Sequence, residues 1–393
     1  MEPSVLALFL VAGLASLFMA WVIGAGSSGA TPFAPAVGAN AISTMRAAFV
    51  VGIFGFAGAV IQGANVSEAV GRGLVGGVSL PAEGVIAVLL IGAGLMAIGI
   101  KTGYPIATAF TVTGAVIGVG LALGGTPVWP KYRQIGAVWV LTPFVGGGIA
   151  YVIASVLPRE DVPERYSVPP LAGLVGAVVA NLQFTGLGPG GTAGSLVALS
   201  GRTLGIEHPL LPWAVSLSVA AAVAAVVWWD VRRDRAGGLR RVLLAFGSLV
   251  AFSAGGSQVG LAVGPLLPLL GDVGPIPVIW VLAGGGLGIL VGSWTGAPRM
   301  IKSLAQDYSS LGPRRSIAAL VPSFLIAQMA VLLGVPVSFN EIIVSAIIGS
   351  GAAVGGRDAI SARKIGVTVG AWAGSFGVAF VLGYGASYAL QMG

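Results

Sequence analysis

The chain has 393 residues, of which 56% are hydrophobic and only 8% are charged. A soluble domain carries roughly 25% charged residues, so most of this protein's surface must face lipid. The sequence contains no cysteine, which excludes a disulfide framework, a thiolate metal site and a catalytic thiol. The net charge of +7 comes from arginines in short connections, and no basic stretch alternates with aromatic residues. Nucleic acid is therefore excluded as a partner, and the lipid bilayer is expected instead.

Long apolar runs dominate the chain. Runs that can cross the hydrocarbon core, about 20 residues each, lie near 3–25, 44–64, 83–101, 134–157, 168–187, 209–230, 242–255, 275–296, 315–334 and 363–390. Other apolar segments contain Pro and Gly beside hydroxyl side chains, as discontinuous or re-entrant helices do; these are 28–42, 104–124, 256–271 and 335–355. The sequence predicts an all-α polytopic protein of the cell membrane with about 10–12 transmembrane segments.

The most basic part of the chain predicts its orientation. It contains five arginines and two aspartates within twelve residues: Asp230, Arg232, Arg233, Asp234, Arg235, Arg240 and Arg241. Short connections rich in arginine and lysine stay in the cytoplasm. We therefore expect this connection on the cytoplasmic side.

An internal repeat organises the sequence. Residues 103–125 align without gaps on residues 334–356 at an offset of 231, and nine of the 23 positions are identical, most of them Gly or Pro. Residues 25–28 resemble residues 254–257 at nearly the same offset. Repeated halves with broken segments at matching positions are typical of secondary transporters. We expect two inverted-topology repeats, at 1–157 and 242–393, flanking central helices and the basic connection at 158–241.

The first repeated block is rich in hydrogen-bond donors. Ser27 and Ser28 are flanked by glycines and followed by Thr31 and a proline, which indicates a helix interruption. The second copy offers Ser257 and Gln258 at the matching place. Hydroxyls and free N–H groups at a helix end suit an anion. The alternative is that these small residues pack helices closely while their hydroxyls bond backward to carbonyls.

The second repeated block follows a proline in each half. Thr108 follows Pro105, and the pair Ser338 and Asn340 follows Pro336. Proline at a first helical position fixes the entry of a short helix whose N–H groups are free. Two such helix starts would complete a cage of donors around an anion. The alternative is ordinary turn chemistry with solvent-facing caps.

These blocks resemble the inorganic phosphate transporter (PiT) family, which includes related sulfate permeases and whose signatures, approximately GANDVANA and PVSTTHA, occur once per half. The supporting residues are Val37-Gly38-Ala39-Asn40-Ala41-Ile42-Ser43, Val263-Gly264-Pro265, Pro105 and Pro336, with the glycine-rich tails that follow. The resemblance covers nearly the whole chain. It implies a secondary transporter, not an enzyme, that carries inorganic phosphate by alternating access with ion coupling.

The family resemblance and the substituted residues favour different substrates. Where the family has Asn-Asp, this chain has Ser27-Ser28 and Ser257-Gln258. Phosphate keeps a proton near neutral pH and gains from an acceptor, whereas sulfate needs donors only. The resemblance favours phosphate, while the lost carboxylates favour sulfate or a similar dianion. We place phosphate first and a sulfate permease of the same fold second.

One carboxylate lies inside a broken segment. Glu341 stands where the family has its histidine and is a candidate proton carrier; the alternative is a glutamate neutralised by Arg299 or Lys302. Losing the family's aspartates weakens a sodium site, because a hard cation prefers charged oxygen ligands. Proton and sodium both stay open as coupling ions, as does a homodimer.

Other functional classes stay open as well. An anion channel could use the same donors. A membrane enzyme would need a cluster of acids, bases or metal ligands, and the spans contain few His, Asp or Glu residues. No cofactor or metal is expected.

Overall fold

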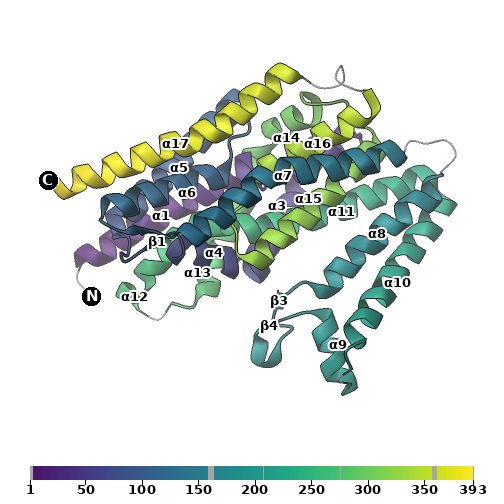
Figure 1. Ribbon diagram of the computed structural model, residues 1–393, viewed down its shortest axis with the longest axis horizontal. Coiled ribbons are helices and arrows are strands. Elements are labelled where there is room, and N and C mark those ends of the chain that lie inside the picture. The colour runs from purple at the N-terminus through teal and green to yellow at the C-terminus, as the bar shows by residue number, and fades with distance from the viewer. Residues whose placement is uncertain (1–2, 158–162, 207, 275, 356–360, 393) are drawn as a thin grey trace.

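The computed structural model describes residues 3–157, 163–206, 208–274, 276–355 and 361–392. Within these ranges the protein is almost entirely helical (Figure 1). The first predicted repeat contains α1 (Pro3–Gly26), α2 (Ala34–Gly38), α3 (Thr44–Gln62), α4 (Ala64–Arg72), α5 (Ala82–Thr102), α6 (Thr108–Ala122) and α7 (Trp129–Val156). Its two short strands, β1 (Val75–Gly76) and β2 (Thr126–Pro127), pair antiparallel.

The central segment forms a helical arm beside the rest of the molecule (Figure 1). It contains α8 (Glu164–Asn181), β3 (Phe184–Thr185), the 3₁₀ turn Pro189–Gly191, β4 (Ala193–Gly194), α9 (Leu196–Leu204) and α10 (Leu211–Arg233). Strands β3 and β4 pair antiparallel. The predicted boundary between 157 and 158 adjoins residues 158–162, which lie outside the described residues.

The second predicted repeat begins within a long helix. Its elements are α11 (Arg235–Val263), the 3₁₀ helix Gly264–Leu269, α12 (Leu270–Val273), α13 (Val278–Thr295), α14 (Ala297–Gln306), α15 (Pro313–Leu333), α16 (Phe339–Gly355) and α17 (Ala362–Met392). The predicted boundary at 241 therefore falls inside α11. The inverted topology of the two repeats stays a prediction.

The described residues contain nine helices that are long and apolar enough to cross a membrane. The helices α6 and α16 are also apolar but shorter, and most of their residues are buried against other described helices. The predicted run at 168–187 forms α8, which is not among the nine. The expectation of a polytopic α-helical membrane protein is confirmed.

Glycines allow helices from different halves to cross closely. An ideal Cβ on Gly24 of α1 would lie 2.1 Å from the carbonyl oxygen of Ile289, and one on Gly255 of α11 would lie 1.8 Å from that of Gly55. Gly24 and Gly255 are separated by the repeat offset of 231. Small residues at such crossings give backbone contact that lipid-facing helices need in order to associate. The high glycine content thus serves packing at these positions.

The two halves also interlock through reciprocal contacts. Helix α6 packs against α17, and α16 packs against α7. The indole N–H of Trp139 donates to the Pro336 carbonyl at 2.8 Å, and that of Trp372 donates to the Pro105 carbonyl at 2.8 Å. Each half therefore holds the broken segment of the other. Reciprocal contacts of this kind are expected when the two halves are related by a repeat.

The short helices do not begin where the prolines stand. Helices α6 and α16 begin at Thr108 and Phe339, three residues after Pro105 and Pro336. The expectation that proline occupies the first helical position is wrong. A proline biases the residue before it toward extended backbone, so each proline lies in the non-helical segment that precedes the helix.

The basic connection is a corner between two helices. Asp234 separates α10 from α11, and its carboxylate accepts a hydrogen bond from the Gly237 N–H at 2.9 Å. Arg241 donates two hydrogen bonds of 2.7 Å to the Asp230 carboxylate. Arg241 therefore links the end of α10 to the start of α11.

Glu164 ties the helical arm to the second repeat. Its Oε1 atom accepts from Arg235 at 2.5 Å and from Arg314 Nε at 2.6 Å. Burial acts to raise the pKa of this carboxyl, but the hydrogen bonds from both arginines and the charge of Arg314 hold the pKa below its ordinary value. Glu164 lies at the start of α8, outside the nine spans.

Candidate functional site

The predicted site residues of the two halves meet in one hydrogen-bond network. The Ser27 hydroxyl donates to Gln258 Oε1 at 3.1 Å, and Gln258 Nε2 donates to the Val337 carbonyl at 2.5 Å. Ser27 and Gln258 are separated by 231 residues, which is the repeat offset. Two fully buried side chains, one from each predicted repeat, therefore contact one another in the protein interior.

Asn340 joins the same network from the start of α16. Its Nδ2 atom donates to the carbonyls of Gly26 at 3.2 Å and Ile106 at 2.7 Å. Since both contacts are to carbonyls, the amide orientation is determined: the nitrogen faces the backbone and Oδ1 faces away from it. The network thus links the end of α1, the segment before α6, α11 and the start of α16.

Several buried polar atoms at this network have no hydrogen-bond partner among the described residues. They are Ser257 Oγ, Ser338 Oγ, Asn340 Oδ1 and Glu341 Oε2. Each belongs to a residue in the network or next to one in sequence. An unpaired buried polar atom costs about 1–3 kcal/mol, so a cluster of them calls for a ligand that supplies partners.

Ser338 and Glu341 have the spacing of a helix-capping box, yet their polar atoms do not cap. In a capping box a Ser before the helix and a Glu three residues later bond to each other's backbone N–H groups. Here Ser338 Oγ and Glu341 Oε2 are both without a partner, and Glu341 is 2% exposed. No ion pair joins Glu341 to Arg299 or Lys302 in the described ranges. The ion-pair alternative for Glu341 is not observed.

Other predicted site residues are buried but bonded locally. The Ser28 hydroxyl lies 3.5 Å from the Ile23 carbonyl, and the Thr31 hydroxyl donates to the Ser27 carbonyl at 3.1 Å. The Thr108 hydroxyl contacts the Met96 sulfur at 3.4 Å. Backward bonds of this kind are the packing alternative for hydroxyls in helices. The structure thus separates Ser27, within the network, from Ser28 and Thr31.

The helix interruption expected around Ser257 is absent from the described structure. Helix α11 runs without a break from Arg235 to Val263, and a 3₁₀ helix begins only at Gly264. In the first half, α1 does end at Gly26, and Gly29 turns the chain so tightly that a Cβ there would lie 1.8 Å from the Gly24 carbonyl oxygen. The second half therefore contributes side chains of a continuous helix.

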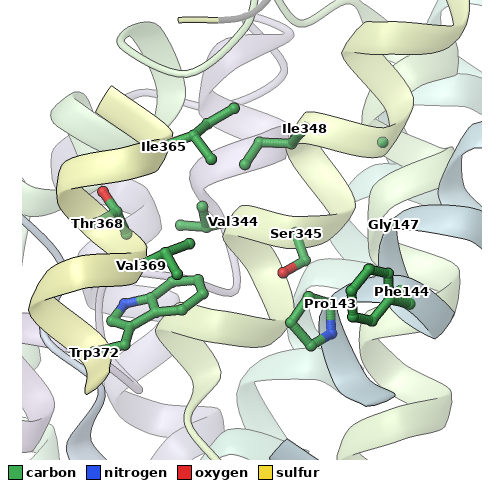
Figure 2. Close-up of a pocket in the computed structure, with 11 residues that line it drawn as sticks. Pro143, Phe144, Gly147, Val344, Ser345, Ile348, Ile365, Thr368, Val369 and Trp372 are labelled. Atoms are coloured by element: carbon green, nitrogen blue, oxygen red, sulfur yellow. The ribbon is translucent and has the colours of Figure 1, made fainter. Parts of the chain in front are cut away.

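A separate pocket between α7, α16 and α17 does not have the properties of an anion site (Figure 2). Its volume is about 220 Å³, and its walls are mostly apolar, with Ser345 and Thr368 as the hydroxyl-bearing residues. The Thr368 hydroxyl is already within 2.9 Å of the Tyr308 hydroxyl. We therefore place the candidate site at the Ser27–Gln258–Asn340 network.

Sequence reasoning missed two buried amides near the network. Gln62 and Gln328 are 7% and 4% exposed, and Gln328 Nε2 donates to Gln62 Oε1 at 3.1 Å. Their signal was an uncharged amide inside an apolar run, which is costly in a membrane unless it is paired.

Comparisons with known proteins agree with this architecture. The sequence model of the phosphate transporter family matches residues 23–383. A protein of Pyrococcus abyssi named "Putative phosphate permease" is 29% identical over 378 residues, covering 90% of each chain. The chloroplastic inorganic phosphate transporter 2-1 of Arabidopsis thaliana is 24% identical over 91% of this chain and 68% of its own.

A solved structure has the same fold. That protein, named "The sodium-dependent phosphate transporter", superposes with a TM-score of 0.81 at 22% identity, over 98% of this chain and 99% of that chain. Together these findings define a multi-pass membrane transporter and not an enzyme. The chain belongs to the phosphate transporter family. The family resemblance inferred from the sequence is confirmed.

Proposed function

We propose that this protein transports inorganic phosphate across the cell membrane and binds it at the Ser27–Gln258–Asn340 network. The observation that carries the proposal is that four buried polar atoms without a partner among the described residues belong to residues in the network or next to one in sequence: Ser257 Oγ, Ser338 Oγ, Asn340 Oδ1 and Glu341 Oε2. The names of the relatives support phosphate as the substrate. Ser257 and Ser338 supply hydroxyl donors to the anion's oxygens, while Ser27 holds Gln258 through its own hydroxyl.

The acceptor at this site favours phosphate over sulfate. Asn340 Oδ1 can only accept a hydrogen bond, and its orientation is set by the two carbonyls bonded to Nδ2. Phosphate near neutral pH carries a proton that it can donate to such an acceptor, whereas sulfate carries none. The lost family aspartates are thus replaced in part by an amide oxygen. A sulfate permease is the second candidate, because the remaining groups are neutral donors.

Transport requires that the site open to each side in turn. The network joins elements of both predicted repeats, so a movement of one against the other would break and remake the Ser27–Gln258 and Asn340–Gly26 contacts. Alternating access by such rocking is the mechanism that we propose. A channel would require a continuous open path and is the less favoured alternative.

We propose that Glu341 couples phosphate entry to proton entry. Its carboxyl is 2% exposed and Oε2 has no partner among the described residues. A buried carboxyl without a cation beside it is able to carry a proton and release it where water reaches it. Sodium is the alternative coupling ion, because the solved relative is named as a sodium-dependent transporter.

Uptake of radiolabelled phosphate into proteoliposomes tests the proposal. An inward proton gradient should drive uptake, Glu341→Gln should abolish that drive, and excess unlabelled phosphate should compete better than sulfate. Glu68→Gln is the matched control, since Glu68 is exposed and pairs with Arg72 at 3.1 Å. Uptake that follows sodium alone would refute proton coupling. Competition by sulfate and not by phosphate would refute the substrate.

A further inference from the structure

A large cavity lies between the helical arm and the body of the protein. Its volume is about 800 Å³, and its walls come from α8 and α10 on one side and from α3, α4 and α15 on the other. Figure 1 shows α8 and α10 running together beside the remaining helices. Although much of the wall is apolar, it contains five amides and two hydroxyls: Gln62, Asn65, Asn181, Gln183, Gln328, Thr185 and Ser216. Asn181 and Gln183 come from the end of α8 and the segment that follows it.

The inner wall of the cavity is closed by a pair of amides. Gln328 Nε2 donates to Gln62 Oε1 at 3.1 Å and to Ser253 Oγ at 2.6 Å. Gln62 Nε2 donates to the Gln183 carbonyl at 3.0 Å. A hydrogen bond between two neutral amides is worth only about 0.5–1.5 kcal/mol net. The Gln62–Gln328 pair can therefore part at small cost.

Polar groups continue from this pair to the phosphate site. Gln328 contacts Ser253 of α11, and Ser257 lies one helical turn further along the same face. Ser257 Oγ has no partner in the described structure, and the next residue, Gln258, belongs to the network. Gln62 also lies against α11 here, because a Cβ on Gly256 would be 2.9 Å from Gln62 Cβ. The cavity and the site are separated by this pair and one turn of helix.

The cavity lies at the end of the arm opposite the basic corner. Asn181 is the last residue of α8, and Trp213 belongs to the first turn of α10. The other ends of these helices contain Glu164, which is bonded to Arg235, and the arginines before Asp234. Since the basic corner is expected in the cytoplasm, the cavity belongs to the external half of the protein.

We propose that this cavity is the external vestibule of the transporter and that the Gln62–Gln328 pair is its gate. Resting on the proposed function, this assigns the amides to the passage of an oxyanion: when the pair parts, their NH₂ groups donate to the anion on its way to Ser257. Neutral donors suit this task, because a buried arginine would hold the anion too tightly for it to move on.

The absence of cysteine from the sequence allows a direct test with single introduced cysteines. Asn181→Cys places a thiol on the vestibule wall, and Ser257→Cys places one behind the gate. Val226→Cys is the control, because Val226 of α10 is 65% exposed and does not line the cavity. Intact cells are treated with a charged, membrane-impermeant maleimide and, separately, with a lipid-soluble one.

We expect Asn181→Cys to react with the charged reagent from outside and Val226→Cys to react only with the lipid-soluble one. Ser257→Cys should react slowly, and at least about tenfold faster when combined with Gln328→Ala, which opens the gate, since loss of about 1.4 kcal/mol is a factor of ten. Gln62→Ala removes the other half of the pair and repeats the test if Gln328→Ala fails to fold.

Three results would overturn the proposal. Asn181→Cys could behave like Val226→Cys, which would mean that lipid fills the cavity; it could react only from the cytoplasmic side; or Ser257→Cys could be indifferent to both gate variants. These outcomes do not depend on transport. If the parent protein bound no phosphate, the proposed function would fail while the labelling pattern still decided whether the cavity is a gated, water-filled vestibule.

Discussion

The two halves of the protein reach the same site by different means. In the first half, α1 ends at Gly26 and Ser27 presents its hydroxyl from the turn that follows. In the second half, α11 continues without a break through Ser257 and Gln258, and Gln258 reaches across with a longer side chain. The first half therefore contributes to the network from a non-helical turn, and the second half contributes from a continuous helix.

This difference shows how two predicted repeats can supply one network with unlike side chains. A serine at position 258 would be too short to bond both Ser27 and the Val337 carbonyl, whereas the glutamine amide has a donor and an acceptor that serve both. The close crossings at Gly24 and Gly255 and the reciprocal tryptophan contacts have stayed alike in the two halves. Packing is shared, and hydrogen-bond chemistry differs.

The largest effect is expected at the shared crossings. Gly24→Ala and Gly255→Ala should each destabilise the protein, because the new Cβ would lie 2.1 Å and 1.8 Å from a backbone carbonyl oxygen, which cannot move aside as a side chain would. Overpacking of this kind costs about 1–3 kcal/mol or more. Thermal unfolding in detergent should show a fall of several degrees for both, and no change for Gly13→Ala, which meets nothing within 4 Å. A large fall for only one of the two variants would show that the two crossings are not packed alike.

The next effect separates two neighbouring serines. Ser27→Ala leaves Gln258 Oε1 without its partner and should raise the KM for phosphate uptake about tenfold, as loss of about 1–2 kcal/mol predicts. Ser28→Ala removes only a contact of 3.5 Å to a carbonyl and should change KM less than about threefold. Equal effects of the two variants would show that the network does not define the site.

A smaller and symmetrical effect is expected at the reciprocal indoles. Trp139→Phe and Trp372→Phe each remove a 2.8 Å hydrogen bond to a proline carbonyl of the other half while keeping an aromatic ring. Each should lower stability by about 0.5–1.5 kcal/mol, read as matching shifts of the melting temperature. Unequal shifts would show that the two halves are held together differently.

The smallest effect concerns acid and the helical arm. The pKa of Glu164 is lowered in the folded protein, so its contribution to stability is present above its ordinary value of 4.5 and is lost as the pH falls through the lowered value. The parent should lose more thermal stability than Glu164→Gln between pH 7 and pH 4. Identical losses would mean that the contacts with Arg235 and Arg314 contribute nothing.

The sequence predicted the class of fold, which is confirmed, whereas the site residues stay a prediction and the long-range contacts between them could not be predicted. Composition and hydrophobic runs were sufficient for the polytopic helical fold and the membrane location, whereas the family came from the resemblance of Val37–Ser43, Val263–Pro265, Pro105 and Pro336 to its signatures. The pattern at Ser257 and Gln258 predicted a helix break in the second half that the structure lacks, because local glycines permit a break without requiring one. For Thr31 the sequence left anion binding and a backward bond to a carbonyl both open, and the structure shows the backward bond; the contact of Thr108 with the Met96 sulfur could not be predicted.

The role of Gln62 and Gln328 could not be predicted from the sequence either. The two residues are 266 positions apart and meet only in the folded chain. Asn340 was identified from its place after Pro336, but the two carbonyls that orient its amide come from the first half. The local sequence was sufficient to select Asn340 as a candidate, but not to predict which distant residues it would contact.

Equilibrium binding of radiolabelled phosphate to the purified protein in detergent tests the central claim most directly. Gln258→Leu removes the amide that joins both halves at the network, whereas Gln328→Leu removes a buried amide at the gate, outside the site. We predict about tenfold weaker binding for Gln258→Leu and nearly unchanged binding for Gln328→Leu. Unchanged binding by the folded Gln258→Leu variant would contradict the account.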